Sequence, residues 1–305
     1  MENIQINRYF ELKQEQIIKI HELYNNSFDL VKMTKDNFVK KLFCNDFTKI
    51  YFFAEIHDKI IGYIVIVQNS ILLLIVDEVY RKNGIGSMLL YKAEQEIKTK
   101  YEKINLVAPD YFFCGVPFDT KSNYCKWFEK RGFMYDWAPF DMIVDLVSFT
   151  HKIEDFPCAI KNIIIKKLEN NNHEIMSCYN GANSVETGWG EYFLGNNVEA
   201  IIAVVNETVI GGVLVPSFSI FDESLKETGS FGAIWVLNEY QGKGVGMKLH
   251  LTSLLELKNR GYKTCHIGYT YLDTFYGRLG AKKYIDYWIG EKNIHDFFVT
   301  SRSLL

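Results

Sequence analysis

Two short glycine-rich stretches have the residue types and the positions to bind an anion. Residues 81–86 read RKNGIG and residues 241–246 read QGKGVG, and each lies between a strand-like apolar run and a helix-like run. The first turn of a helix presents unpaired N–H groups and a partial positive charge, and glycine lets a phosphate approach that backbone closely. One such stretch is more often a plain turn, but two at matched positions favour a phosphate-binding role.

Neither stretch fits the more common nucleotide-binding motifs. A P-loop requires Ser or Thr directly after its lysine, and neither Lys243 nor Lys248 is followed by one in the required frame. A dinucleotide-binding G-x-G-x-x-G is absent too, because Gly244-x-Gly246 runs on into Met247. Binding of ATP or NAD by these two routes is therefore disfavoured.

The glycine stretches belong to an internal repeat that covers nearly the whole chain. Residues 52–67 align with residues 201–216, and each segment reads as two strands joined by a tight polar turn. The glycine stretches follow these segments in the same order. We therefore expect two tandem domains with one fold, at residues 1–150 and 160–305.

The expected elements of each half define a fold class. Each half reads as strand, helix, hairpin, third strand, glycine stretch, long helix, strand, helix and strand. In the second long helix, the apolar residues Leu249, Leu254 and Leu257 recur with helical spacing. The order predicts an α/β protein in which a mixed, mostly antiparallel sheet is flanked by helices in both halves.

Composition limits the possible partners and compartments. Of the 305 residues, 48% are apolar and 23% are charged, and the formal net charge is −3. This charge gives no reason to expect a nucleic acid or an anionic membrane as a partner. The six cysteines are scattered without a metal-ligand spacing, and no apolar run is long enough to span a bilayer. We expect a cytoplasmic protein with reduced thiols and no metal.

The glycine stretches share the pattern [R/Q]-x-x-G-x-[G/A], and each half later contains an aromatic–glycine passage, in residues 126–135 and 274–284. This ordered set of motifs resembles the GNAT superfamily of N-acetyltransferases, and the resemblance covers nearly all of the chain. It implies two GNAT-like, acyl-CoA N-acyltransferase-like domains in tandem, with acetyl-CoA (coenzyme A) as the co-substrate.

The resemblance also implies which residues bind the cofactor. In the superfamily, the strand before the glycine stretch pairs with the pantetheine arm, and the stretch itself binds the pyrophosphate through backbone N–H groups. The residues implied are Val236, Leu237, Gln241, Gly242, Lys243, Gly244, Val245 and Gly246 in the second half, and Val76, Arg81, Asn83, Gly84, Ile85 and Gly86 in the first.

A tyrosine in the aromatic–glycine passage often donates a proton to the departing coenzyme A thiolate in this superfamily, which is general-acid catalysis. The resemblance assigns this role to Tyr276, for which the alternative is a packing aromatic. The first half has Phe128 at the same position, with Tyr124 one helical turn earlier as a substitute. We therefore expect the C-terminal half to be catalytic and the N-terminal half to be a degenerate copy.

No motif marks the base that would deprotonate an acceptor amine. The candidates are Glu186, Glu191, Glu239 and Asp273, for each of which a solvated surface carboxylate is the alternative. His266, on an expected strand, is equally consistent with a core histidine. The aromatic insertion at residues 109–124 is consistent either with a surface that packs between the two domains or with a lid over an acceptor site.

The resulting hypothesis is an acetyl-CoA-dependent N-acetyltransferase. Its acceptor would be a primary amine of a small molecule or a peptide, attacking the thioester directly through a tetrahedral intermediate. Two alternatives stay open: a non-catalytic acyl-CoA sensor or scaffold, and an acyltransferase with another acyl donor.

Overall fold

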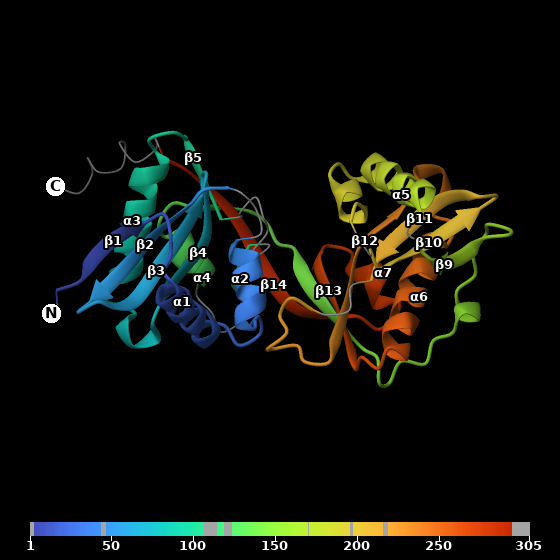
Figure 1. Ribbon diagram of the computed structural model, residues 1–305, viewed down its shortest axis with the longest axis horizontal. Coiled ribbons are helices and arrows are strands. Elements are labelled where there is room, and N and C mark those ends of the chain that lie inside the picture. Colours follow the sequence, from blue (N-terminus) through green and yellow to red (C-terminus); the bar gives the residue numbers. More distant parts are fainter. Residues whose placement is uncertain are drawn as a thin grey trace. The chain divides into compact units, whose positions relative to one another are not determined.

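A computed structural model describes residues 3–43, 47–106, 115–118, 124–169, 171–195, 198–215 and 219–294. It divides into two units (Figure 1). Unit 1 comprises residues 1–139, 220–224 and 285–305, and unit 2 comprises residues 140–219 and 225–284. Cys44, Cys114 and most of the insertion at 109–124 lie outside the described residues.

In unit 1 the sheet order is β1-β2-β3-β4-β5-β14, and neighbouring strands are antiparallel except β4 and β5. Helix α3 packs against β2–β4 on one face, and α1 packs on the other, where Tyr63 of β3 donates a hydrogen bond to Ile20 O. The elements are β1 (Gln5–Tyr9), α1 (Gln14–Ser27), α2 (Lys35–Leu42), β2 (Lys49–Ile56), β3 (Lys59–Val67), β4 (Ser70–Val76), η1 (Glu78–Tyr80), α3 (Ile85–Ile97), β5 (Lys103–Asn105), β6 (Val116–Phe118), α4 (Tyr124–Glu129) and β7 (Met134–Trp137).

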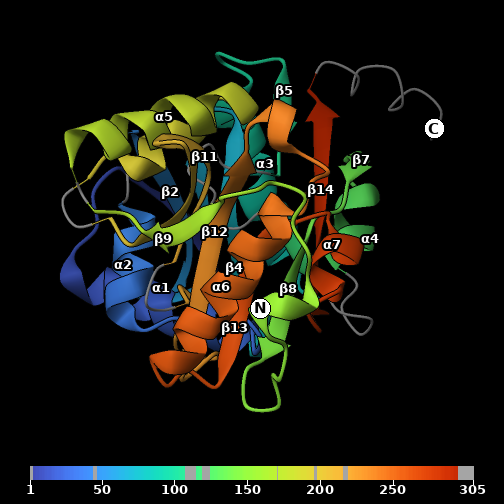
Figure 2. The ribbon, with the colours of Figure 1, turned by 90° about the vertical axis from the view of Figure 1, so that its right-hand side faces the viewer.

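In unit 2 the sheet order is β9-β10-β11-β12-β13-β8, and only β12 and β13 are parallel neighbours. Helices α5 and α6 lie on opposite faces of this sheet (Figures 1 and 2). The elements are β8 (Phe140–Asp145), η2 (Ile153–Asp155), β9 (Ile164–Lys167), α5 (Asn172–Val185), η3 (Trp189–Phe193), β10 (Ala200–Val205), β11 (Thr208–Leu214), β12 (Thr228–Val236), η4 (Asn238–Tyr240), α6 (Val245–Asn259), β13 (Thr264–Thr270) and α7 (Asp273–Gly277). The strand that follows, β14 (Lys282–Asn293), starts in unit 2 and belongs to unit 1 from Ile285 on.

The expected mixed, mostly antiparallel sheet with flanking helices is confirmed. The two copies of the internal repeat also share details of backbone conformation and strand register. The hairpins β2–β3 and β10–β11 each turn through two residues with positive φ, at 57–58 and at 206–207, as type I′ turns require. Both hairpins shift register at the same place, after Ala54 and after Ala203. The glycine stretches occupy the same topological position, between β4 and α3 and between β12 and α6.

The units differ from the contiguous halves expected from the sequence, because the last strand of each copy lies in the sheet of the other unit. Strand β8 ends the first copy, yet it pairs with β13 of unit 2, Val144 lying opposite Cys265. Strand β14 ends the second copy, and its last residues pair with β5 of unit 1, Glu291 lying opposite Asn105 (Figure 2, long red arrow). A sequence boundary at 150–160 does not reveal this exchange, because each strand keeps its own hydrophobic pattern wherever it pairs.

A short segment from the second copy also belongs to unit 1. Residues 220–224, between β11 and β12, bind the connection between α1 and α2. The Asp222 carboxylate accepts hydrogen bonds from the N–H and the hydroxyl of Thr34, at 2.8 and 2.7 Å. Ser224 Oγ accepts from Lys32 N at 2.7 Å and donates to Asp29 O at 2.8 Å. These bonds fix the start of α2, since Thr34 is its N-cap.

The described helices contain none that is long and apolar enough to cross a membrane.

We expect Asp222→Ala to lower the free energy of unfolding by about 1–2 kcal/mol, because two hydrogen bonds to a charged group are lost. Glu223→Ala is the matched control, since Glu223 is exposed in the same segment, and it should change that free energy by less than about 0.5 kcal/mol. Urea denaturation measures both values. Equal effects of the two substitutions would show that the segment does not brace the α1–α2 connection.

Candidate functional site

The two glycine stretches have the same backbone conformation. Gly84 and Gly244 are the N-cap residues of α3 and α6, and their φ angles are +81° and +91°. Two residues earlier, Lys82 and Gly242 also have positive φ, at +65° and +71°. Alternating conformations of this kind turn successive N–H groups toward one point and form an anion-binding concavity at the helix N-terminus.

The first residue of each stretch is bound to the strand that precedes it. Arg81 Nε donates to Val76 O, and Gln241 Nε2 donates to Val236 O, both at 2.9 Å. Arg81 also donates to Ser27 Oγ at 3.3 Å, at the end of α1. In this structure the side chains of Arg81 and Gln241 therefore hold each loop on the strand that precedes it.

The strand before the loop has an open edge in unit 1. Asp77 N donates to Ile61 O of β3 at 2.9 Å, so strand alternation directs the N–H of Val76 to the opposite edge. On that edge, the pairing of β4 with β5 is confined to Ser70 opposite Asn105 within the described residues. The backbone of β4 beyond Ser70 is thus available to an extended ligand.

Unit 2 repeats this edge. Leu237 N donates to Ile210 O at 2.9 Å, so the Leu237 N–H is already used and the Val236 N–H faces the other edge. The pairing of β12 with β13 ends at Phe231, opposite Ile267. Of the two strand residues expected to bind cofactor here, Val236 has a suitably directed N–H and Leu237 does not.

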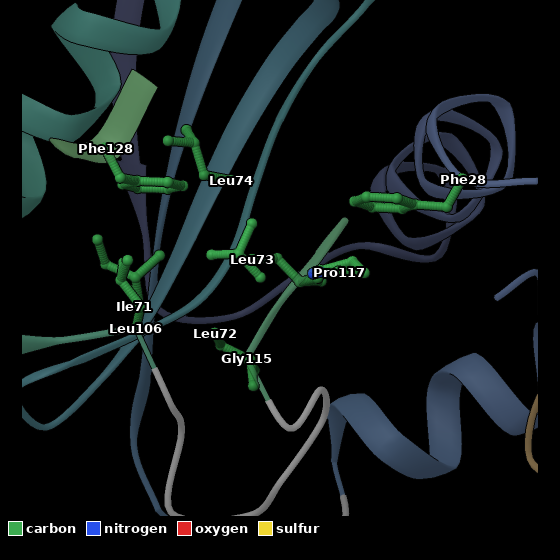
Figure 3. Close-up of a pocket in the computed structure, with 10 residues that line it drawn as sticks. Phe28, Ile71, Leu72, Leu73, Leu74, Leu106, Gly115, Pro117 and Phe128 are labelled. Carbon is green, nitrogen blue, oxygen red and sulfur yellow. The ribbon is translucent and has the colours of Figure 1, made fainter. Parts of the chain in front are cut away.

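The open edge of β4 leads into an apolar pocket in unit 1 (Figure 3). Phe28 follows the end of α1 and lies on one side of it, and Phe128 of α4 lies on the other (Figure 3). The complete lining is Phe28, Ile71, Leu72, Leu73, Leu74, Leu106, Gly115, Val116, Pro117 and Phe128. None of these residues carries an ionisable side chain. Sequence reasoning did not predict this pocket, because its wall combines five separate segments.

Tyr124 lies beside this pocket. Its ring contacts the Phe28 ring in an edge-on arrangement, with 6.4 Å between the centroids. It is on α4, one turn before Phe128, which is buried in the core of unit 1. The ring of Tyr124 therefore lies next to Phe28, a residue of the pocket lining, on the same helix as Phe128.

The glycine loop of unit 2 is covered on one side, whereas the loop of unit 1 is open. Ala159 N donates to Lys243 O at 2.9 Å, which holds the segment after η2 against the loop. A Cβ added at Gly244 would lie 2.5 Å from Pro157 O, while one added at Gly84 would meet no atom within 4 Å. The sequence placed a domain boundary in this segment and gave no sign that it packs on the loop.

The cations near the two loops are also used differently. In unit 1, Arg131 stacks on Trp127 and donates to Ser87 Oγ at 2.7 Å, in the first turn of α3. In unit 2, Leu279 takes the place of Arg131 in the repeat. Lys243 and Lys248 bond to backbone carbonyls instead, those of Glu239 and Ile153. Unit 1 thus has a guanidinium beside the first turn of the helix that follows its glycine loop, and unit 2 has a leucine at that position of the repeat.

Tyr276 lies in the core of unit 2 and is 5% exposed. Its ring packs against Phe231, His250 and Phe275, with centroids 5.8, 5.1 and 5.0 Å away. Burial raises the pKa of its hydroxyl, which is hydrogen-bonded to Thr270. These surroundings match the packing aromatic that the sequence left as the alternative, and they favour it over a proton donor.

The candidate bases are not brought together. Glu186, Glu191, Glu239 and Asp273 are all exposed. His266 is buried, and its ring nitrogens contact Ser219 Oγ at 3.1 Å and Asp141 Oδ2 at 3.0 Å. No sequence spacing revealed that set, because Asp141 comes from the exchanged strand β8. Within the described ranges, no group of three or more His, Cys, Asp or Glu side chains is placed to hold a metal ion.

Comparison with known proteins agrees with this geometry. Residues 17–114 match the model of the acetyltransferase (GNAT) family. A structure described as a GCN5-related glucosamine N-acetyltransferase region of a fungal multi-domain GH3 β-N-acetylglucosaminidase superposes with a TM-score of 0.79 at 20% identity, over 95% of this chain and 38% of that one. The present chain thus spans well under half of that protein. No curated protein matches the chain.

Two further structures match along their whole length. A tandem GNAT protein from the clavulanic acid biosynthesis pathway gives a TM-score of 0.70 at 12% identity, over 96% of this chain and 99% of that one. The chain is a tandem protein of the GNAT fold. A GCN5-related N-acetyltransferase from Sphaerobacter thermophilus gives a TM-score of 0.64 at 13% identity, covering 95% and 96% of the two chains. In the present chain, the match to the family model falls on unit 1, which has the open loop.

His250, which packs on Tyr276, should make unit 2 sensitive to acid. It is fully buried, neither ring nitrogen has a hydrogen-bond partner among the described residues, and burial lowers its pKa from 6.5 to about 3. The unfolded chain therefore binds a proton that the folded chain does not. Stability is full above pH 6.5 and falls by about 1.4 kcal/mol per unit as the pH drops toward 3.

The variant that tests this is His250→Leu. Leucine is chosen because the first copy of the repeat has Leu90, in α3, at the equivalent position. We expect it to reduce the loss of stability between pH 6.5 and 4, as measured by urea denaturation at several pH values. An unchanged pH profile would contradict a neutral, buried His250.

Proposed function

We propose that this protein is an N-acyltransferase that uses an acyl-CoA donor, acetyl-CoA included, and binds its cofactor in unit 1. The observation that carries the proposal is that three features lie along one strand: the open Gly84 loop follows β4, the edge of β4 beyond Ser70 has no strand partner among the described residues, and Ile71–Leu74 of β4 line the apolar pocket. The sequence favoured the C-terminal half as the catalytic one. The covered Gly244 loop and the buried Tyr276 favour the N-terminal unit instead.

The residues of unit 1 suit each part of coenzyme A. The N–H groups at the start of α3 and the helix dipole would bind the pyrophosphate, and the Arg131 guanidinium beside Ser87 adds positive charge there. The free N–H of Val76 would pair with the pantetheine arm. The apolar pocket would hold the acyl group, and its lining would exclude water from the neighbouring thioester.

In the reaction, an amine nitrogen bonds to the thioester carbonyl carbon and the carbon–sulfur bond breaks. The amine loses a proton and the departing thiolate gains one. That thiolate has a pKa of roughly 8.5 by analogy with cysteine, and we propose that the Tyr124 hydroxyl donates to it. The acceptor is a primary amine, and glucosamine is worth testing because one structural relative is described by that activity.

A second function is favoured by one observation. The pocket lining contains no ionisable side chain that could deprotonate an amine. A pocket without a base is what we expect of a protein that binds acyl-CoA but does not transfer the acyl group, and this is the second function. Release of free thiol in the presence of amines, glucosamine included, distinguishes the two functions, since only the transferase produces it above the rate without amine.

The binding loop can be tested with a matched pair of glycine substitutions. We expect Gly84→Val to abolish coenzyme A binding in isothermal titration calorimetry, because the side chain occupies the space that a phosphate needs. Gly242→Val should bind like the wild type. Both glycines have positive φ and open surroundings, so the cost to folding is comparable. If only Gly242→Val lost binding, the assignment to unit 1 would be wrong and coenzyme A would bind in unit 2.

The proton donor can be tested by removing single hydroxyl groups. Tyr124→Phe should lower the turnover number by about 10²-fold, at the low end of general-acid effects, with coenzyme A affinity unchanged. Tyr276→Phe should retain turnover, although the lost bond to Thr270 lowers the free energy of unfolding by about 1 kcal/mol. Steady-state thiol release measures both rates, and the reverse pattern would restore Tyr276 as the acid.

A further inference from the structure

We propose that the pocket of unit 1 binds an acyl chain longer than acetyl, and that the preferred donor is a short-chain acyl-CoA of about four carbons. This inference rests on the proposed binding of coenzyme A in unit 1. It names the substrate class of that site, and three features of the pocket carry it.

The first feature is the position of the pocket along β4. The loop is bound to the strand at Val76, whereas the pocket is lined by the four consecutive residues from Ile71 to Leu74. From Val76 to Ile71 the strand advances by about 16 Å. The far end of the pocket is thus displaced from the phosphate loop by most of the strand, on the side where the acyl group of a bound thioester would extend.

The second feature is a β-bulge in the pocket wall. Ile71 lies opposite Ile66, but Leu73 lies opposite Val65, so Leu72 is an extra residue in β4. A bulge redirects side chains and bends the strand. Ile71 and Leu74 pack with the core cluster on the α3 side of the sheet, whereas Leu72 and Leu73, next to each other in the bulge, lie outside that cluster and both line the pocket (Figure 3).

The third feature is the combination of an apolar lining and a limited size. The lining residues are aliphatic or aromatic apart from a glycine and a proline, so a hydrocarbon chain is the ligand they solvate best. The pocket has a volume of about 60 Å³. Because a water molecule needs about 10–15 Å³ of such space, there is room for about four to six heavy atoms. An acetyl group alone would leave much of it empty.

The experiment measures the affinity of the full-length protein for coenzyme A and for its acetyl, propionyl, butyryl, hexanoyl and octanoyl thioesters by calorimetry. Each methylene buried in the pocket should tighten binding by about fourfold. We expect affinity to rise by about tenfold or more from acetyl to butyryl and to stop rising beyond that length.

A substitution then tests whether this pocket sets the limit. Leu73→Ala enlarges the pocket and should shift the best binder to hexanoyl- or octanoyl-CoA. Leu89→Ala is the matched control, because Leu89 is an equally buried leucine of unit 1 that lies on α3 and does not line the pocket. It should keep the butyryl preference, and thermal unfolding of both variants checks that they fold.

The outcomes separate this inference from the proposed function. If acetyl-CoA binds as tightly as the longer thioesters, or if Leu73→Ala leaves the preference unchanged, the acyl assignment is overturned while coenzyme A binding stands. The pocket would then serve an apolar part of the acceptor. If coenzyme A and all its thioesters fail to bind, the proposed function fails first.

Discussion

The structure of both units depends on a strand that loses its partner partway along its length. In unit 1, β4 is paired with β3 throughout, and among the described residues it is paired with β5 only at its beginning. A buried strand edge without a partner leaves N–H and C=O groups unsatisfied, which costs free energy unless something binds them. The Arg81 side chain satisfies one carbonyl, that of Val76. An extended ligand that pairs with the rest of this edge would remove the remaining cost, and the glycine loop at the end of the strand would hold its charged end.

The two copies share this architecture but differ in what surrounds it. Unit 1 has an exposed loop, a cation beside the first turn of α3 and a pocket beyond the open edge. In unit 2 the corresponding loop is in contact with Pro157, and the tyrosine of the aromatic–glycine passage is enclosed by aromatic rings. The residue types of the second copy fit the family pattern better, but the space around the first copy fits a ligand better. We therefore use the accessibility of the glycine loop, and not the match of residue types, to choose unit 1 as the cofactor-binding copy.

Much of the fold could be predicted because the signals were local. The type I′ turns, the loop glycines at the helix N-caps and the apolar strands depend on a few neighbouring residues each. What the sequence did not reveal depends on distant segments. The exchange of β8 and β14, the docking of Asp222 on Thr34 and the packing of Pro157 on Gly244 join residues that are 80 or more positions apart. Similarly, Tyr276 had the residue type of a proton donor, and only its burial in unit 2 changed that interpretation.

Hydrogen exchange of the backbone amides, measured by mass spectrometry with and without coenzyme A, tests the central claim most directly. The amides from Lys82 to Met88 are the groups that would bind the pyrophosphate, and those from Gly242 to Lys248 are their counterparts in unit 2. We predict that coenzyme A slows exchange in the first set and leaves the second set unchanged. Slowed exchange confined to the second set would contradict the account and return the working site to the C-terminal copy.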